Sequence, residues 1–228
     1  MQSRIDNLTE LVDFREHTRI FSDRQHAGRV LGHLLAGRVP QESLVLAIPA
    51  GGVPVACALA GTMGLEKDVM VVSKITFPWN SEAGYGAVAQ NGLVRLDQRI
   101  LNFAGLSEAQ VQQGISVTTA KVNRRAKTLR GDKPPLDLQN RKVVLVDDGI
   151  ASGTTMRVAI EAARQMGAAS VVLAVPTAHQ ESLRRISSLA DAIYCANVRS
   201  GSPFAVADAY HHWFDVSESS CMALLAGE

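Results

Sequence analysis

The sequence predicts an α/β protein with a doubly wound, mostly parallel sheet. Short apolar runs, of the kind that form buried strands, alternate along the chain with longer stretches of helical periodicity. Two of these runs, 44–48 and 142–146, are followed by glycine-containing turns that lead straight into predicted helices. The repetition of strand, tight turn and helix favours parallel strands joined by crossover helices.

The first half of the chain begins with a polar segment, residues 1–20, which we expect to be a loosely docked arm. Ser22 and Gln25 have the spacing of a capping box, so a helix is predicted to begin there. The predicted elements are a helix over 22–37, a strand over 44–48, a helix over 53–63 and a strand over 68–73 that ends at Lys74.

The middle of the chain opens with residues 75–92, which contain proline, glycine and aromatic residues and are expected to form a long functional loop. Asn91-Gly92 predicts a hairpin turn between residues 87–88 and 93–96. A second capping box, at Ser107 and Gln110, predicts a helix to about Arg130. Its basic C-terminal end is either a solvated face or a binding surface for a phosphate or an acidic partner.

The second half repeats the alternation. Its predicted elements are a strand over 142–146, a helix to about 166, a strand over 170–176, a helix over 180–189, a strand over 192–196 and a short helix from about 217. We therefore expect a single domain over 1–228. Its core would be formed by about 20–74 and 140–200, and a cover, or hood, by about 75–135 and the tail 201–228.

The turn after the strand at 142–146 has the composition of a phosphate-binding loop. The strand ends in Asp147 and Asp148, and small and hydroxyl residues follow before the next helix. Glycines let such a turn bend tightly, and the helix start offers free N–H groups and a partial positive charge. A phosphate site beside two carboxylates suits a sugar phosphate. An ordinary strand-to-helix turn is the alternative, although two acids at a buried strand end are costly without a partner.

The segment Val-Asp-Asp-Gly-Ile-Ala-Ser-Gly-Thr-Thr, residues 146–155, resembles the signature of the type I phosphoribosyltransferases. The resemblance extends over roughly residues 20–216 and is to bacterial members of unassigned substrate. It implies that the loop binds the 5′-phosphate of phosphoribosyl pyrophosphate (PRPP) and that Asp147 and Asp148 face the ribose hydroxyls. The implied 5′-phosphate site consists of Ala151, Ser152, Gly153, Thr154 and Thr155.

The same resemblance implies a pyrophosphate site at Ala50, Gly51 and Gly52, where glycines permit a close approach of backbone N–H groups to an anion. The family often has Arg or Lys where this chain has Ala50. The family also has a flexible loop that closes over PRPP. We expect residues 75–92 to be this lid, with Glu82 and Tyr85 as site residues.

Three further side chains are candidates. Lys74, at the end of a predicted strand, is either a ligand of pyrophosphate or ribose oxygens or a solvated lysine. Phe204 and Tyr210 in the tail either stack on a base or pack the C-terminus down. Trp213 and Phe214 are expected to pack.

Composition limits the classes of function. A formal charge of +1 gives no electrostatic case for nucleic acid binding. Three well-separated cysteines without a Cys-x-x-Cys pair favour a reducing compartment. Residues 1–16 do not have the composition of a signal peptide, and no apolar run is long enough to span a bilayer. We therefore expect a cytoplasmic protein without membrane or nucleic acid partners.

The resemblance implies an enzyme that binds PRPP with Mg²⁺ and transfers the phosphoribosyl group to a nitrogen acceptor, a nucleobase-like molecule, with release of pyrophosphate. No direct protein ligand is expected for Mg²⁺, which Asp147 and Asp148 would contact through water. Relatives that act on 6-oxopurines commonly have Asp at the place of Ala151, so hypoxanthine and guanine are expected to be poor substrates. Homodimers are common in the family.

A PRPP-binding regulator without catalysis stays open as an alternative, because Ala50 and Ala151 both replace functional side chains. A P-loop kinase is disfavoured since the chain contains no Gly-x-x-x-x-Gly-Lys-Ser/Thr. A response-regulator-like domain also has paired acids after a strand, but the glycine and hydroxyl loop does not fit it.

Overall fold

The computed structural model describes residues 5–227, with the side chains of residues 81 and 82 excepted. The core is a six-stranded sheet in which every neighbouring pair is parallel, in the order β1-β9-β8-β7-β2-β3. The strands are β1 (Leu8–Glu10), β2 (Leu44–Ala47), β3 (Glu66–Val69), β7 (Lys142–Val146), β8 (Ser170–His179) and β9 (Ala192–Arg199). The predicted fold class is confirmed.

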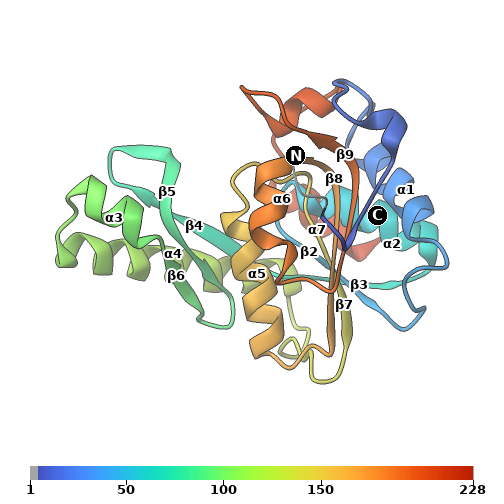
Figure 1. Ribbon diagram of the computed structural model, residues 1–228. Coiled ribbons are helices and arrows are strands. Elements are labelled where there is room, and N and C mark those ends of the chain that lie inside the picture. Colours follow the sequence, from blue (N-terminus) through green and yellow to red (C-terminus); the bar gives the residue numbers. More distant parts are fainter. Residues whose placement is uncertain (1–4, 228) are drawn as a thin grey trace.

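Helices cover both faces of this sheet (Figure 1). They are α1 (Arg24–Leu35), α2 (Gly52–Met63), α5 (Thr154–Gln165) and α6 (Gln180–Ser187). Alternate residues of β7 point to opposite faces. Val144 and Val146 pack in a buried cluster with the α1–α2 layer, whereas Val143 and Leu145 pack in a second cluster with α5 and α6. Strands that are buried on both sides explain the nearly continuous apolar runs of the sequence.

The chain leaves two adjacent strands of the sheet in opposite directions. From β2 it continues to β3 on one side, and from β7 it continues to β8 on the other. Such a point opens a crevice beyond the carboxyl ends of the two strands, and open α/β sheets bind their ligands there. The turns after β2 and β7 are the two glycine-containing turns singled out in the sequence.

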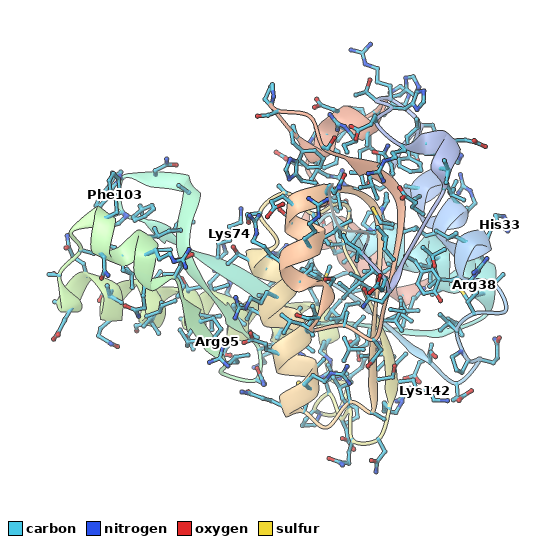
Figure 2. All side chains as sticks on the ribbon, in the orientation of Figure 1. His33, Arg38, Lys74, Arg95, Phe103 and Lys142 are labelled. Atoms are coloured by element: carbon cyan, nitrogen blue, oxygen red, sulfur yellow. The ribbon has the colours of Figure 1, made fainter. Side chains whose placement is uncertain are left out.

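A separate three-stranded antiparallel sheet forms an arm that projects from the core (Figure 1). It contains β4 (Val72–Phe77), β5 (Asn80–Ala89) and β6 (Val94–Leu96), followed by α3 (Gln98–Ala104) and α4 (Glu108–Arg130). The hairpin at Asn91-Gly92 and the capping box between Ser107 and Gln110 are both present. Figure 2 shows Phe103 at the outer end of the arm, where it is 95% exposed.

Four local predictions are wrong. Residues 75–92 are mainly strand and belong to the β4–β5 hairpin, and the strand predicted over 68–73 is divided between β3 and β4. The N-terminal segment contributes β1, which pairs with β9 at the edge of the main sheet. Asp23, rather than Ser22, caps α1, because its side chain accepts from the His26 N–H at 2.7 Å.

The C-terminal segment returns to the core. After a short 3₁₀ turn at Val206–Ala209, the chain passes the start of α1 and ends in α7 (Glu218–Ala226), which packs on α2 and α4. Within residues 5–227 no helix is both long enough and apolar enough to cross a membrane.

Candidate functional site

The turns that follow β2 and β7 are in contact. A Cβ atom at Gly51 would overlap Oδ2 of Asp148, and one at Gly52 would lie 2.7 Å from the Val146 carbonyl oxygen. Only residues without a side chain permit this approach. The structure therefore brings the predicted pyrophosphate turn and the predicted ribose-binding acids together, although they are about a hundred residues apart in the sequence.

The two acids, Asp147 and Asp148, both have raised pKa values. Oδ1 of Asp147 accepts the backbone N–H of Asp148 at 2.8 Å, and the two carboxyl groups are close enough to affect each other's ionisation. Burial raises the pKa of Asp147 well above its usual range, and the negative charge of Asp148 raises it further. Burial also raises the pKa of Asp148, but the Arg24 guanidinium opposes this change. Asp147 is therefore the group that retains a proton more readily.

The loop after β7 is fixed by its neighbours on two sides. Ile150 exchanges backbone hydrogen bonds with β8, donating to the Thr177 carbonyl at 3.0 Å and accepting from the His179 N–H at 2.9 Å. On the other side, the Ser182 hydroxyl of α6 donates to the Ala151 carbonyl. Gly153 adopts a positive φ of 82° and precedes α5, whose first N–H groups are turned toward the loop. This is the local geometry of an anion site at a helix start.

A cavity of about 190 Å³ lies between this loop, β4 and the tail. Four of the five predicted 5′-phosphate residues line it: Ala151, Ser152, Gly153 and Thr155. The predicted ribose-binding acid Asp147 forms another wall, and Val206 covers it from the C-terminal segment. One small cavity therefore joins the loop after β7 to Asp147 of the acidic pair.

Most of the chain matches a known protein family. The phosphoribosyl transferase domain family matches residues 21–209, which contain both turns and the acidic pair. This chain belongs to the phosphoribosyltransferase family. The resemblance seen in the sequence is thereby confirmed.

Two similar proteins are informative about this chain. A Mycobacterium tuberculosis protein named "Putative phosphoribosyl transferase" is 33% identical over 210 residues, which are 91% of this chain and 46% of that protein. The chain thus spans about half the length of the curated relatives it matches. The crystal structure of the protein TT1426 from Thermus thermophilus is also 33% identical, with a TM-score of 0.74, and the match covers 91% of this chain and 98% of that one.

Lys74 lines the cavity, but it does not lie at a strand end of the parallel sheet. It is an exposed residue within β4, opposite Ala87 of β5, and it forms part of the cavity lining. Figure 2 shows it where the arm joins the core. The arm therefore presents a cation to the cavity that the loop after β7 lines.

Of the two candidates from the expected lid, Tyr85 does not line the cavity, and the side chain of Glu82 cannot be placed. Tyr85 is 1% exposed and packs against Phe77 inside the arm, which does not fit its expected role in a lid. The side chain of Glu82 lies outside the described residues.

The tail candidates differ from each other. The ring of Tyr210 is 4% exposed and packs against Phe21 and Trp213, so the structure does not support base stacking for it. Its hydroxyl donates to the Asp148 carbonyl oxygen at 2.6 Å. Phe204 is half-buried, with the Arg199 guanidinium 4.9 Å from its ring centroid. It lies two residues before Val206 of the cavity wall.

Two residues that support the site, Arg24 of α1 and Ser182 of α6, were not predicted from the sequence. Nε of Arg24 donates to Asp148 Oδ2 at 2.8 Å, and both side chains are nearly buried. Neither Arg24 nor Ser182 belongs to a local sequence pattern that points to the site. A buried carboxylate at 148 requires a partner, but only the fold identifies which cation supplies it.

The donor atoms of the site fit Mg²⁺ only if the ligand completes its coordination shell. Within the described part of the chain, no group of three or more His, Cys, Asp or Glu residues could hold a metal ion. The two carboxylates, of which Asp147 lines the cavity, offer the hard oxygen atoms that Mg²⁺ prefers. Mg²⁺ is commonly bound by one or two carboxylates together with water and substrate phosphates.

Proposed function

We propose that the chain binds PRPP with Mg²⁺ and transfers the phosphoribosyl group to a nitrogen acceptor, a nucleobase-like molecule, with release of pyrophosphate. The observation that supports this most strongly is the contact between Gly51 and Asp148 at the switch point of the sheet. This contact places the Gly51–Gly52 turn, which is suited to binding one anion, against Asp148. Asp147 and Asp148 are followed by the loop 151–155, which is suited to binding a second anion. PRPP has this pattern of groups, with a phosphate and a pyrophosphate on either side of a ribose.

In this proposal each part of the site has one binding task. The loop 151–155 and the first turn of α5 bind the 5′-phosphate through N–H and hydroxyl donors. Asp147 and Asp148 accept hydrogen bonds from the ribose hydroxyls. Gly51 and Gly52 present backbone N–H groups to the pyrophosphate, next to Ala50, and Lys74 adds a positive charge from the arm.

The reaction breaks the bond between C1 of the ribose and a pyrophosphate oxygen, and the bonding electrons leave with pyrophosphate. The acceptor nitrogen forms the new bond to C1 and releases its proton to solvent. Positive charge develops on the sugar ring and negative charge on the leaving group. The acids near the ring and the donors near the pyrophosphate are arranged to stabilise these opposite charges.

Mg²⁺, when bound, would neutralise charge on the pyrophosphate. Asp147 and Asp148 would contact it through water molecules, because the remaining positions would be taken by the substrate. Phe204 is the aromatic residue that we assign to the acceptor side. The three cysteines are free in the structure, and we place the protein in a reducing cytosol.

The direct test is isothermal calorimetry with PRPP and Mg²⁺, followed by a pyrophosphate-release assay over a panel of nucleobases. Asp148→Asn and Thr154→Ala should each weaken PRPP binding by about tenfold or more, because each removes a hydrogen bond to a charged group. The matched controls are Asp132→Asn and Thr18→Ala, at exposed positions outside the site. Unchanged PRPP affinity in both site variants would exclude the assignment.

The same experiment separates the enzyme from a PRPP-binding regulator. A regulator would bind PRPP with the same dependence on Asp148 and Thr154 but release no pyrophosphate with any acceptor. The observation that favours a regulator is Ala50, where a cationic side chain that could bind pyrophosphate is absent.

A further inference from the structure

Arg24, the first residue of α1, is held by three partners. Its Nε donates to Asp148 Oδ2 at 2.8 Å, and its Nη1 donates to the Phe214 carbonyl oxygen at 2.7 Å. The guanidinium carbon lies 3.7 Å from the centroid of the Trp213 ring. The side chain is 11% exposed, so its position is determined by these contacts rather than by solvent. A planar guanidinium can make hydrogen bonds in its plane and stack through its face at the same time, which lysine cannot do.

Asp148 is therefore attached to the C-terminal segment at two points. Arg24 links its carboxylate to Trp213 and Phe214, and the Tyr210 hydroxyl links its backbone carbonyl to the same segment. The Tyr210 and Trp213 rings also contact each other, with centroids 5.1 Å apart. A change in the position of the Asp148 carboxylate should therefore be transmitted to the segment 210–214, because the contacts are short and the Arg24 and Tyr210 side chains that make them are nearly buried.

The Arg24 guanidinium also lies close to the turn after β2. The carboxylate that it binds is the one that occupies the space beside Gly51. Arg24 thus has two conceivable roles at the site. It holds Asp148 in place, or it provides the pyrophosphate turn with the charge that Ala50 does not supply. The near-complete burial of its side chain and its existing three contacts favour the first role.

We propose that Arg24 is a positioning residue that fixes the Asp148 carboxylate for the ribose hydroxyls, and that it couples occupation of the sugar-phosphate site to the segment 210–214. This inference rests on the proposed function, since it requires a ribose phosphate as the ligand. The start of α1 and the segment 210–214 would thus take part in ligand binding by positioning Asp148. Neither the loop 151–155 nor the turn at Gly51 and Gly52 has this role.

The first test compares two ligands, ribose 5-phosphate and PRPP, each with Mg²⁺, by calorimetry. If Arg24 acts through Asp148, Arg24→Gln lowers the affinity for both ligands by a similar factor of about 10 to 100, because a buried charged hydrogen bond is lost. Arg24→Lys should recover only part of this loss, since it keeps the charge but not the stacked fork. Arg29→Gln, at an exposed position of the same helix, is the control and should bind both ligands as the unaltered chain does.

The second test observes the tail directly. The chain has two tryptophans, so Trp79→Phe leaves Trp213 as the only one. We expect its fluorescence to change on titration with PRPP and Mg²⁺, with the same midpoint as the calorimetric curve. The change should be much smaller when Arg24→Gln is added and the ligand is raised to saturation, because only the Tyr210 link to Asp148 remains.

The outcomes are distinct. A loss confined to PRPP, with ribose 5-phosphate unaffected, would overturn the positioning role and make Arg24 a pyrophosphate contact. Equal affinities in Arg24→Gln and Arg29→Gln, or a Trp213 signal that ignores the ligand, would overturn the inference while the proposed function stands. Failure of the unaltered chain to bind PRPP would overturn both.

Discussion

A Cβ atom at Gly51 would occupy the position of Asp148 Oδ2. The two residues follow different strands of the parallel sheet, β2 and β7, and belong to the two turns at its switch point. The glycine is needed because of what lies against it rather than because of its own conformation. Gly51 has ordinary helical dihedral angles, φ −60° and ψ −32°, which any residue adopts.

Gly51→Ala therefore isolates the steric effect. The added methyl group must displace the Asp148 carboxylate, and we expect PRPP affinity to fall by about tenfold or more as hydrogen bonds to this charged group are lost. Gly61→Ala in α2, the helix that follows Gly51, is the control, since a Cβ atom there meets nothing within 4 Å. It should leave binding unchanged and stabilise the fold by up to about 1 kcal/mol, as alanine does for glycine in a helix. Calorimetry and thermal unfolding measure the two effects, and equal PRPP affinity in both variants would contradict this account.

The raised pKa of Asp147 predicts how stability depends on pH. Burial and the charge of Asp148 favour the protonated carboxyl in the folded chain. The unaltered chain therefore loses stability as the pH rises from the unfolded value, about 3.9, through the raised folded pKa. Asp147→Asn removes this ionisation. We expect it to be more stable than the unaltered chain at pH 7, with a difference that shrinks as the pH falls toward 4.

Chemical denaturation between pH 4 and pH 8 measures this difference in the free energy of unfolding. Asp132→Asn, at an exposed position, is the control and should follow the unaltered chain throughout. A stability difference for Asp147→Asn that is the same at every pH would show that the carboxyl titrates normally. The gain in stability should be accompanied by weaker PRPP binding, because the acid pair is part of the proposed ribose site.

The parts of the site that sequence reasoning predicted are those determined by local order. A buried strand that ends in acids, followed by small residues and a helix, specifies its own geometry. Four residues of the loop and Asp147 do line one cavity: Ala151, Ser152, Gly153 and Thr155. Arg24 was not predictable because its partner, Asp148, is 124 positions away and no local pattern marks the pair. Ser182 supports the loop from α6 in the same way.

The arm shows why glycine misled the secondary-structure prediction. Gly84 and Gly86 suggested a loop, but both lie within β5, where neighbouring strands approach closely. A Cβ atom at Gly84 would lie 3.0 Å from the Ile75 carbonyl oxygen, and one at Gly86 would overlap the Arg95 carbonyl oxygen. Glycine in a strand marks a close backbone approach as readily as a turn. Composition alone cannot distinguish a glycine in a turn from a glycine in a strand, because it does not show which strand lies alongside.

Ala151 predicts the acceptors that this chain will not use. Its side chain is an exposed methyl group on the cavity wall, and it can neither donate nor accept a proton. We expect no measurable pyrophosphate release with hypoxanthine or guanine, although PRPP binds. A steady-state assay with both bases, beside acceptors that lack the 6-oxo group, measures this. Measurable turnover of either 6-oxopurine would show that Ala151 does not limit the acceptor.

Ser182 supports the phosphate loop through a single hydrogen bond, from its hydroxyl to the Ala151 carbonyl oxygen, and the residue is 1% exposed. Arg185 reinforces the contact, because its Nη2 donates to the Ser182 hydroxyl at 2.8 Å. Ser182→Ala leaves the carbonyl and the guanidinium without this partner. We expect the loss of about 1 to 2 kcal/mol in the free energy of unfolding, as for other buried hydrogen bonds.

PRPP affinity should fall in Ser182→Ala as well, by roughly three- to tenfold, because the loop must be reordered before it can bind the phosphate. The matched control is Ser187→Ala at the end of the same helix, where the hydroxyl also donates to a backbone carbonyl, that of Arg184 at 3.0 Å. It should lower stability to a similar or smaller extent without changing affinity. If both variants lower PRPP affinity equally, the loss is caused by the lower stability of α6. The contact between Ser182 and the loop then has no separate part in binding.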